Sequence, residues 1–192
     1  FLTTQKYLDK ENYSYPFVAY FLGEINLDTL LEPDLVNVPG VLLAANERGN
    51  ILFLKDWQYD TSQEYYNYEL WIRSINWEAG QEVSIIDSVK MSYPWSNVYI
   101  QPPYLFTLSS DNNLALTKMD IDEGGKFINL SEIKIGEVWG DIVGISANRL
   151  YLDIDGASIL TASIGYNTVP TLENIFQIPA YPQKVRIGDK GI

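Results

Sequence analysis

The residues best suited to contact a ligand lie in one aromatic and acidic stretch, DWQYDTSQEYYNYELW, at residues 56–71. Tyrosine and tryptophan combine a flat apolar ring with a polar group, which suits stacking on a sugar or anchoring a protein partner. The polar middle of the stretch predicts a loop between two strands. The candidate binding residues are Trp57, Tyr59, Tyr65, Tyr66 and Tyr68.

A purely structural role for these aromatic residues is the alternative. Trp57 and Trp71 would then lie at strand ends and pack inside the fold. Tyr65 and Tyr66 would be ordinary loop residues. An earlier stretch, YLDKENYSYP at residues 7–16, has a similar composition, which favours a shared structural role over a unique site.

Two short acidic segments are the candidates for metal binding: MDIDEGG at 119–125 and LDIDGAS at 152–158. A Ca²⁺ loop needs three or more oxygen ligands at alternating positions and a closing carboxylate. Asp153 and Asp155 supply half of such a set, and no glutamate follows at the required spacing. Residues two apart on a strand share a face, so paired carboxylates before a turn usually form a solvated corner. We therefore expect no cofactor, with Ca²⁺ at Asp153 and Asp155 as the alternative.

The chain contains no histidine and no cysteine. This excludes disulfides, thiol nucleophiles and thiolate metal sites, and it removes the commonest general base at neutral pH. A glycoside hydrolase needs only two Asp or Glu residues at a fixed separation, and Asp141 is one candidate among 25 acidic residues. A catalytic site would have to use carboxylates, tyrosine, lysine or serine.

The formal net charge of −12, with 13 Lys and Arg residues scattered along the chain, argues against two classes of partner. Nucleic acid requires a basic face that displaces counterions from phosphates, and anionic lipid surfaces attract basic segments. No apolar run approaches the ~18 residues of a membrane-spanning helix. We therefore expect a protein or glycan partner, no nucleic acid and no membrane insertion.

Short apolar runs separated by turn residues predict an all-β fold. Three hairpins recur: VLLAANERGNILFLKDW at 41–57, VYIQPPYLFTLSS at 98–110 and DIVGISANRLYLDID at 141–155. Two further strands are expected after each hairpin. Four antiparallel strands in every ~40–50 residues is the period of a β-propeller blade. Continuous apolar runs also fit blades, because both faces of a central strand are then buried.

The two ends of the chain fit the same repeat. Residues 1–25 align with 53–75 as a second strand, an acidic loop and a third strand, while KVRIGDKGI at 184–192 aligns with the hairpin turn around Gly49. The expected blades are 1–38 (partial), 39–90, 95–136 and 138–180, followed by 183–192 as a closing strand or the first strand of a further blade. The chain thus contains about four blades' worth of strands in one domain or part of one.

In its blade rhythm, in strands such as GNILFLKDW and NRLYLDIDG, the chain resembles the β-propeller repeat families of the WD40-like and secreted types. The Gly-His and Trp-Asp dipeptides of WD40 blades are absent. The resemblance implies four-stranded antiparallel blades, in a closed four-bladed ring or in a fragment of a larger propeller whose remainder would be a further partner. The alternative fold is a β-sandwich.

The function that we expect is a non-catalytic protein-interaction or scaffold propeller, binding a protein or a glycan through its aromatic loops. The alternative is a carboxylate-dependent carbohydrate-active enzyme or another extracellular enzyme. Many Tyr, Asn, Ser and Thr residues on β-structure, with a start at Phe1 that suggests processing, favour an extracytoplasmic location, secreted or at the cell surface.

Overall fold

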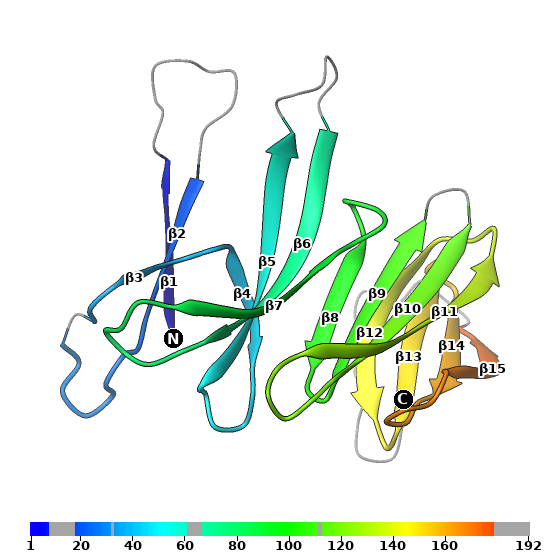
Figure 1. Cartoon of the computed structure of the whole chain (residues 1–192). Helices are drawn as coiled ribbons and strands as arrows, with labels where there is room; N and C mark the ends of the chain where they lie inside the picture. The colour runs from blue at the N-terminus through cyan, green and yellow to red at the C-terminus, as the bar shows by residue number, and fades with distance from the viewer. Residues whose placement is uncertain (8–17, 32, 61–66, 111–112, 179–192) are drawn as a thin grey trace. The chain divides into compact units, whose positions relative to one another are not determined.

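A computed structural model describes residues 1–7, 18–31, 33–60, 67–110 and 113–178 of the 192-residue chain. Within these ranges the protein has 15 β-strands and no helix, so the all-β prediction is confirmed. Over the same ranges, no helix could cross a membrane. The strands form four antiparallel sheets in two compact units (Figure 1).

The N-terminal unit comprises Phe1–Pro94 with Gly124–Lys126, and it contains the first two sheets. The first sheet has three strands in the order β1 (Leu2–Tyr7), β2 (Val18–Gly23), β3 (Val36–Val38). The second has four, in the order β4 (Val41–Ala45), β5 (Ile51–Asp60), β6 (Asn67–Asn76), β7 (Ser84–Lys90). The hairpin of β5 and β6 is the longest pairing of this unit.

The C-terminal unit comprises Trp95–Glu123 and the chain from Phe127 onward. Its first sheet has the order β8 (Asn97–Gln101), β9 (Tyr104–Ser110), β10 (Leu114–Ile121), β11 (Phe127–Gly136). Its second has the order β12 (Gly140–Ser146), β13 (Arg149–Ile154), β14 (Ser158–Ser163), β15 (Thr171–Gln177). In all four sheets, strands adjacent in sequence are adjacent in space.

The predicted hairpin corners are confirmed, each with a different turn chemistry. Ala147 and Asn148 both have positive φ, 48° and 59°, the combination of a two-residue type I′ turn whose twist matches the flanking strands. In the β4–β5 turn, the Asn46 side chain accepts the Asn50 and Ile51 amides at 3.1 Å each, and Gly49 takes a φ of 71°. Pro102 and Pro103 connect β8 to β9.

The first strand of two of the sheets has a bulge at the same place. The pairing of β4 with β5 shifts register between Leu42 and Ala44, and that of β12 with β13 shifts between Ile142 and Gly144. A bulge adds one unpaired residue and increases the local twist. The first strands of these two sheets therefore share the same irregularity of register.

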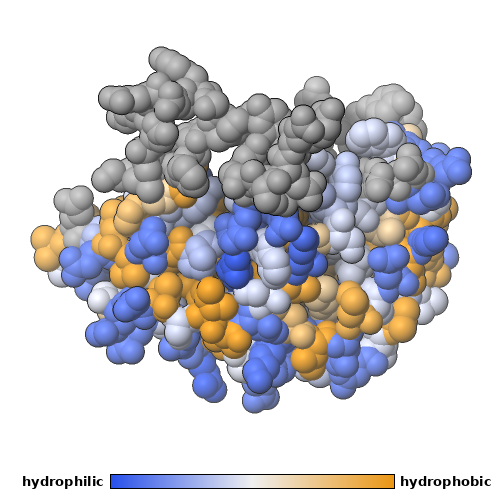
Figure 2. All heavy atoms as spheres, turned by 45° about the horizontal axis from the view of Figure 1, so that its top comes forward, coloured by the Kyte–Doolittle hydropathy of each residue, from blue (hydrophilic) through white to orange (hydrophobic). Residues whose placement is uncertain are grey.

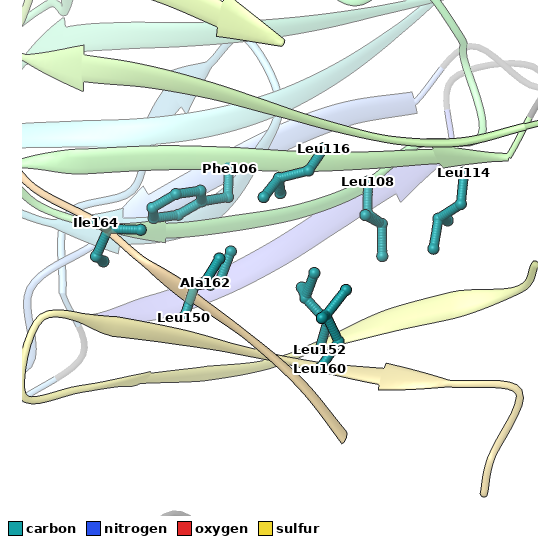
Figure 3. Close-up of a cluster of buried hydrophobic side chains, with 9 residues drawn as sticks. All are labelled: Phe106, Leu108, Leu114, Leu116, Leu150, Leu152, Leu160, Ala162 and Ile164. Carbon is teal, nitrogen blue, oxygen red and sulfur yellow. The ribbon is translucent and has the colours of Figure 1, made fainter. Parts of the chain in front are cut away.

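Leucine-rich faces join the two sheets within each unit. In the C-terminal unit the sheet of β9 and β10 packs on that of β13 and β14 (Figure 3); the buried residues are Phe106, Leu108, Leu114, Leu116, Leu150, Leu152, Leu160, Ala162 and Ile164. In the N-terminal unit the cluster is Leu22, Val38, Leu52, Leu54, Ile75 and Trp77. The Trp77 indole N–H donates to Glu24 Oε1 at 2.6 Å, which satisfies its polar atom.

The last strands of the partial blade at 1–38 and of the blade at 138–180 are shorter than those ranges would allow. β3 begins only at Val36, because Pro33 and Asp34 disfavour a ladder. β15, the last described strand, runs from Thr171 to Gln177. The predicted closing strand at 183–192 lies outside the described residues.

Candidate functional site

Three of the predicted aromatic residues, Trp57, Tyr59 and Tyr68, have backbone positions in the distal half of the β5–β6 hairpin. The register pairs Tyr59 with Tyr68 and Trp57 with Leu70. Directly paired residues point to the same face of a sheet, so the positions of Trp57, Tyr59 and Tyr68 share one face. The strands end at Asp60 and resume at Asn67, as the predicted loop requires, and Tyr65 and Tyr66 lie outside the described residues.

Trp57 is 43% exposed and is nevertheless held from two sides. Its indole N–H donates to the carbonyl of Pro94 at 3.1 Å. The Lys55 ammonium lies 4.3 Å from the centre of its ring, within the range of a cation–π interaction. Burial lowers the pKa of Lys55, since desolvation disfavours the charged form.

The opposite face of the same hairpin has a continuous polar network. The Arg73 guanidinium contacts Asp56 at 3.1 Å and Ser88 at 2.9 Å, and it stacks 5.3 Å above the ring of Trp71. The Trp71 indole donates to Glu69 at 3.0 Å, and Glu69 also pairs with Lys90. Because Trp71 alternates with Leu70, it lies on the face opposite Trp57. The two tryptophans therefore do not form one cluster.

The acidic candidate residues lie on β12, on β13 and in the turn that follows β13. Asp155 and Gly156 form the β13–β14 turn with φ of 53° and 65°, and Asp155 Oδ1 accepts the amide of Trp139 at 2.9 Å. Asp153 lies on β13 directly opposite Asp141 of β12, and its Oδ1 is buried without a hydrogen-bond partner. Asp141 accepts its neighbouring amide, that of Ile142, at 2.8 Å. Over the described ranges, no three acidic side chains are grouped as a metal site would require.

A buried ion pair on β10 is the polar feature that the sequence analysis missed. The side chains of Lys118 and Asp120 are both 0% exposed, with Nζ and Oδ1 separated by 2.5 Å. They continue the alternation of Leu114 and Leu116 on the face that packs against the neighbouring sheet. The acidic segment 119–125 was interpreted as a solvated corner, and this is wrong for Asp120.

The loop between β14 and β15 supplies further hydrogen-bond partners for this ion pair. Lys118 Nζ donates to the carbonyl of Thr168 at 3.0 Å. Asp120 Oδ2 accepts the backbone amide of Asn167 at 2.8 Å and the side-chain amide of Asn129 at 3.2 Å. Buried charges persist only when their hydrogen bonds are satisfied, so this network attaches the loop of one sheet to the central strand of the other.

The described part of the N-terminal unit has a cavity of about 350 Å³. No charged side chain lines it; the lining residues are Thr3, Thr4, Gln5, Tyr20, Phe21, Leu22, Val38, Gly40, Val41 and Leu42. Such a lining offers shape and a few polar groups but no acid, base or metal ligand.

No protein-family model matches the chain, and no curated protein matches its sequence.

Removing one member of the buried pair tests its structural role. Asp120→Ala should reduce the free energy of unfolding by about 3–5 kcal/mol, because it leaves the Lys118 charge buried and uncompensated. The double change Lys118→Met with Asp120→Leu removes both charges and should be much less destabilising. Urea denaturation measures both. Glu173→Ala, at the more exposed Arg149–Glu173 pair, is the control and should change little; equal losses in the single and double variants would contradict the assignment.

Tyr104 gives a prediction of pH dependence. Burial raises its pKa above the ordinary value, and the negative charge of Asp120 adds to the effect. A raised folded-state pKa contributes stability below about pH 10, which is lost as the pH rises through that pKa. Tyr104→Phe should therefore lose less stability than the wild type between about pH 8 and about pH 11. Asp120→Asn should lower the pKa of Tyr104, measured by NMR titration, only part of the way to its ordinary value. The effect of burial, which is the larger cause, remains in this variant. If Tyr104→Phe and the wild type lost the same stability over this pH range, the raised pKa of Tyr104 would be contradicted.

Proposed function

We propose that the chain is a β-propeller, or part of one, that acts as a non-catalytic interaction module and binds a protein through Trp57. Each of the three complete sheets has strands in the order first to fourth, as in a propeller blade. The first sheet repeats the second, third and fourth positions of that order. The bulge shared by β4 and β12 also supports repetition of one structural unit.

The observation that supports the binding function best is the fixed exposure of Trp57. A tryptophan that is 43% exposed but fixed by a hydrogen bond and a cation loses little conformational freedom when a partner covers it. Tryptophan is enriched among the residues that dominate protein–protein binding energy. The hairpin on which it lies is fixed on its other face by the Asp56–Arg73–Ser88 network.

The surroundings of Trp57 favour a protein over a glycan. The Lys55 ammonium lies over one face of this ring, which leaves at most the other face for stacking on a sugar. The indole N–H, which could bind a hydroxyl group, already donates to Pro94. A protein partner can instead contact the ring and pair a carboxylate with Lys55 in the same interface.

The interactions of the acidic candidates favour an interaction module over an enzyme. Asp155 stabilises its own turn through the amide of Trp139, and Asp141 accepts a backbone amide of its own strand. Both contacts are typical of structural carboxylates. An extracytoplasmic location, and the remainder of a larger propeller as a partner, stay predictions.

Binding through Trp57 can be tested by placing a photo-crosslinking residue at Tyr68, identifying the protein captured from the source organism, and titrating it in purified form. Trp57→Ala should weaken its binding at least tenfold, about 1.4 kcal/mol, and Trp57→Phe should weaken it less. Trp139→Ala, at a tryptophan that is 78% exposed, is the matched control. Unchanged affinity of Trp57→Ala would refute the proposal, as would Trp57-dependent binding to a panel of oligosaccharides alone.

A further inference from the structure

A group of apolar side chains lies between β2 and β3, in a turn that is exposed among the residues the structure describes. Leu27, Leu30 and Leu31 are 80%, 74% and 71% exposed. Three neighbouring leucines at this exposure are unusual, because burial of each such side chain would be favourable. On the face shown in Figure 2, hydrophobic residues reach the surface in several places among hydrophilic ones.

The backbone holds this turn in a defined shape. Asn26 Oδ1 accepts the amides of Asp28 and Thr29 at 2.9 and 3.2 Å, and its carbonyl accepts the amide of Leu30 at 2.8 Å. This is the pattern of a capped single turn. Asn26 thus fixes the region of the chain that presents Leu27 and Leu30.

Leu30 adopts a strained conformation that its own packing does not explain. Its φ is 51°, in the left-handed region that a branched apolar residue rarely occupies. Glycine or asparagine would suit this position better. A strained residue whose large side chain is 74% exposed stabilises nothing visible in the fold, and such strain is characteristic of binding segments.

The charge around the turn identifies the kind of partner. Residues 24–34 include four acidic residues. The stretch between Lys10 and Arg48 contains no other Lys or Arg. The Glu24 carboxylate is bound to Trp77, whereas Asp28 and Asp34 are exposed. A second copy of the chain, with its net charge of −12, would be repelled at such a surface.

We propose that residues Leu27, Leu30 and Leu31 form a second docking surface, which inserts into an apolar groove bordered by lysine or arginine on a partner protein. This surface is separate from Trp57 and does not depend on the function proposed for it. The leucines would supply the buried contacts, and the carboxylates of Asp28 and Asp34 would pair with the basic border and set the orientation.

The test uses the full chain and a defined probe. The probe is a fluorescent synthetic peptide of leucine and lysine that forms an amphipathic helix, and its counterpart has glutamate in place of lysine. Fluorescence anisotropy at near-physiological salt measures both. The Leu/Lys peptide should bind and the Leu/Glu peptide should not.

Leu30→Gly is the decisive variant because it removes the side chain and at the same time suits the left-handed backbone. It should weaken the Leu/Lys peptide at least tenfold without lowering the midpoint of urea denaturation. Asn148→Gly, at a second left-handed residue with a φ of 59°, is the matched control and should bind as the wild type does. Trp57→Ala should also bind this peptide normally, which separates the two surfaces.

Three results would overturn the proposal. Equal binding by Leu30→Gly and the wild type would show that the peptide is held by the general negative charge. A lower denaturation midpoint for the joint change Leu27→Ser with Leu31→Ser would show that these leucines are part of the folded core. A wild-type dimer in sedimentation that Leu30→Gly converts to a monomer would identify a second copy as the occupant.

Discussion

The fold depends on burial of both faces of the inner strands. On β5 and β6, Leu52, Leu54 and Ile75 point to one face, while Phe53 and Ile72 point to the other, and all five are at most 1% exposed. Strands buried on both faces are uniformly apolar rather than alternating, which explains the continuous Ile, Leu and Phe runs of the sequence. The outer strand β15, in contrast, is exposed along its length. Burial is therefore concentrated on the inner strands, whereas β15 presents its side chains at the surface of the described residues.

The fully buried ion pair of β10 is fixed by partners from outside its own strand. Lys118 and Asp120 occupy core-facing positions of β10 because the Asn167–Thr168 backbone and Asn129 satisfy them. On the β5–β6 hairpin, Arg73 has the same role for Asp56 and Ser88. In both places a charged side chain joins neighbouring elements through hydrogen bonds. The contacts of Arg73 therefore also hold the hairpin that carries Trp57, from the face opposite to Trp57.

Much of the architecture could be predicted from short-range signals. The Ala147–Asn148 turn, the Pro102–Pro103 corner and the loop after Asp60 were predicted from local residue chemistry. Pairings across the fold could not be predicted in this way. Asp120 was interpreted as part of a solvated corner, because the Asn167 amide that binds it lies 47 residues further on. The exposure of Leu27 and Leu30 could not be predicted either, because exposure and φ are not visible in a pattern of residues. The aromatic composition of residues 56–71 predicted the end of the hairpin. Only the strand register shows that Trp57 and Trp71 lie on opposite faces of the sheet.

The central claim is that Trp57 is exposed yet rigid, and indole ¹⁵N relaxation in the free protein measures this directly. We expect an order parameter of about 0.85 for the Trp57 indole N–H, the value of a rigid backbone. Its exchange with solvent should also be slow, because Pro94 accepts its hydrogen bond. An order parameter below ~0.6 with rapid exchange would show a mobile surface side chain and would contradict the account.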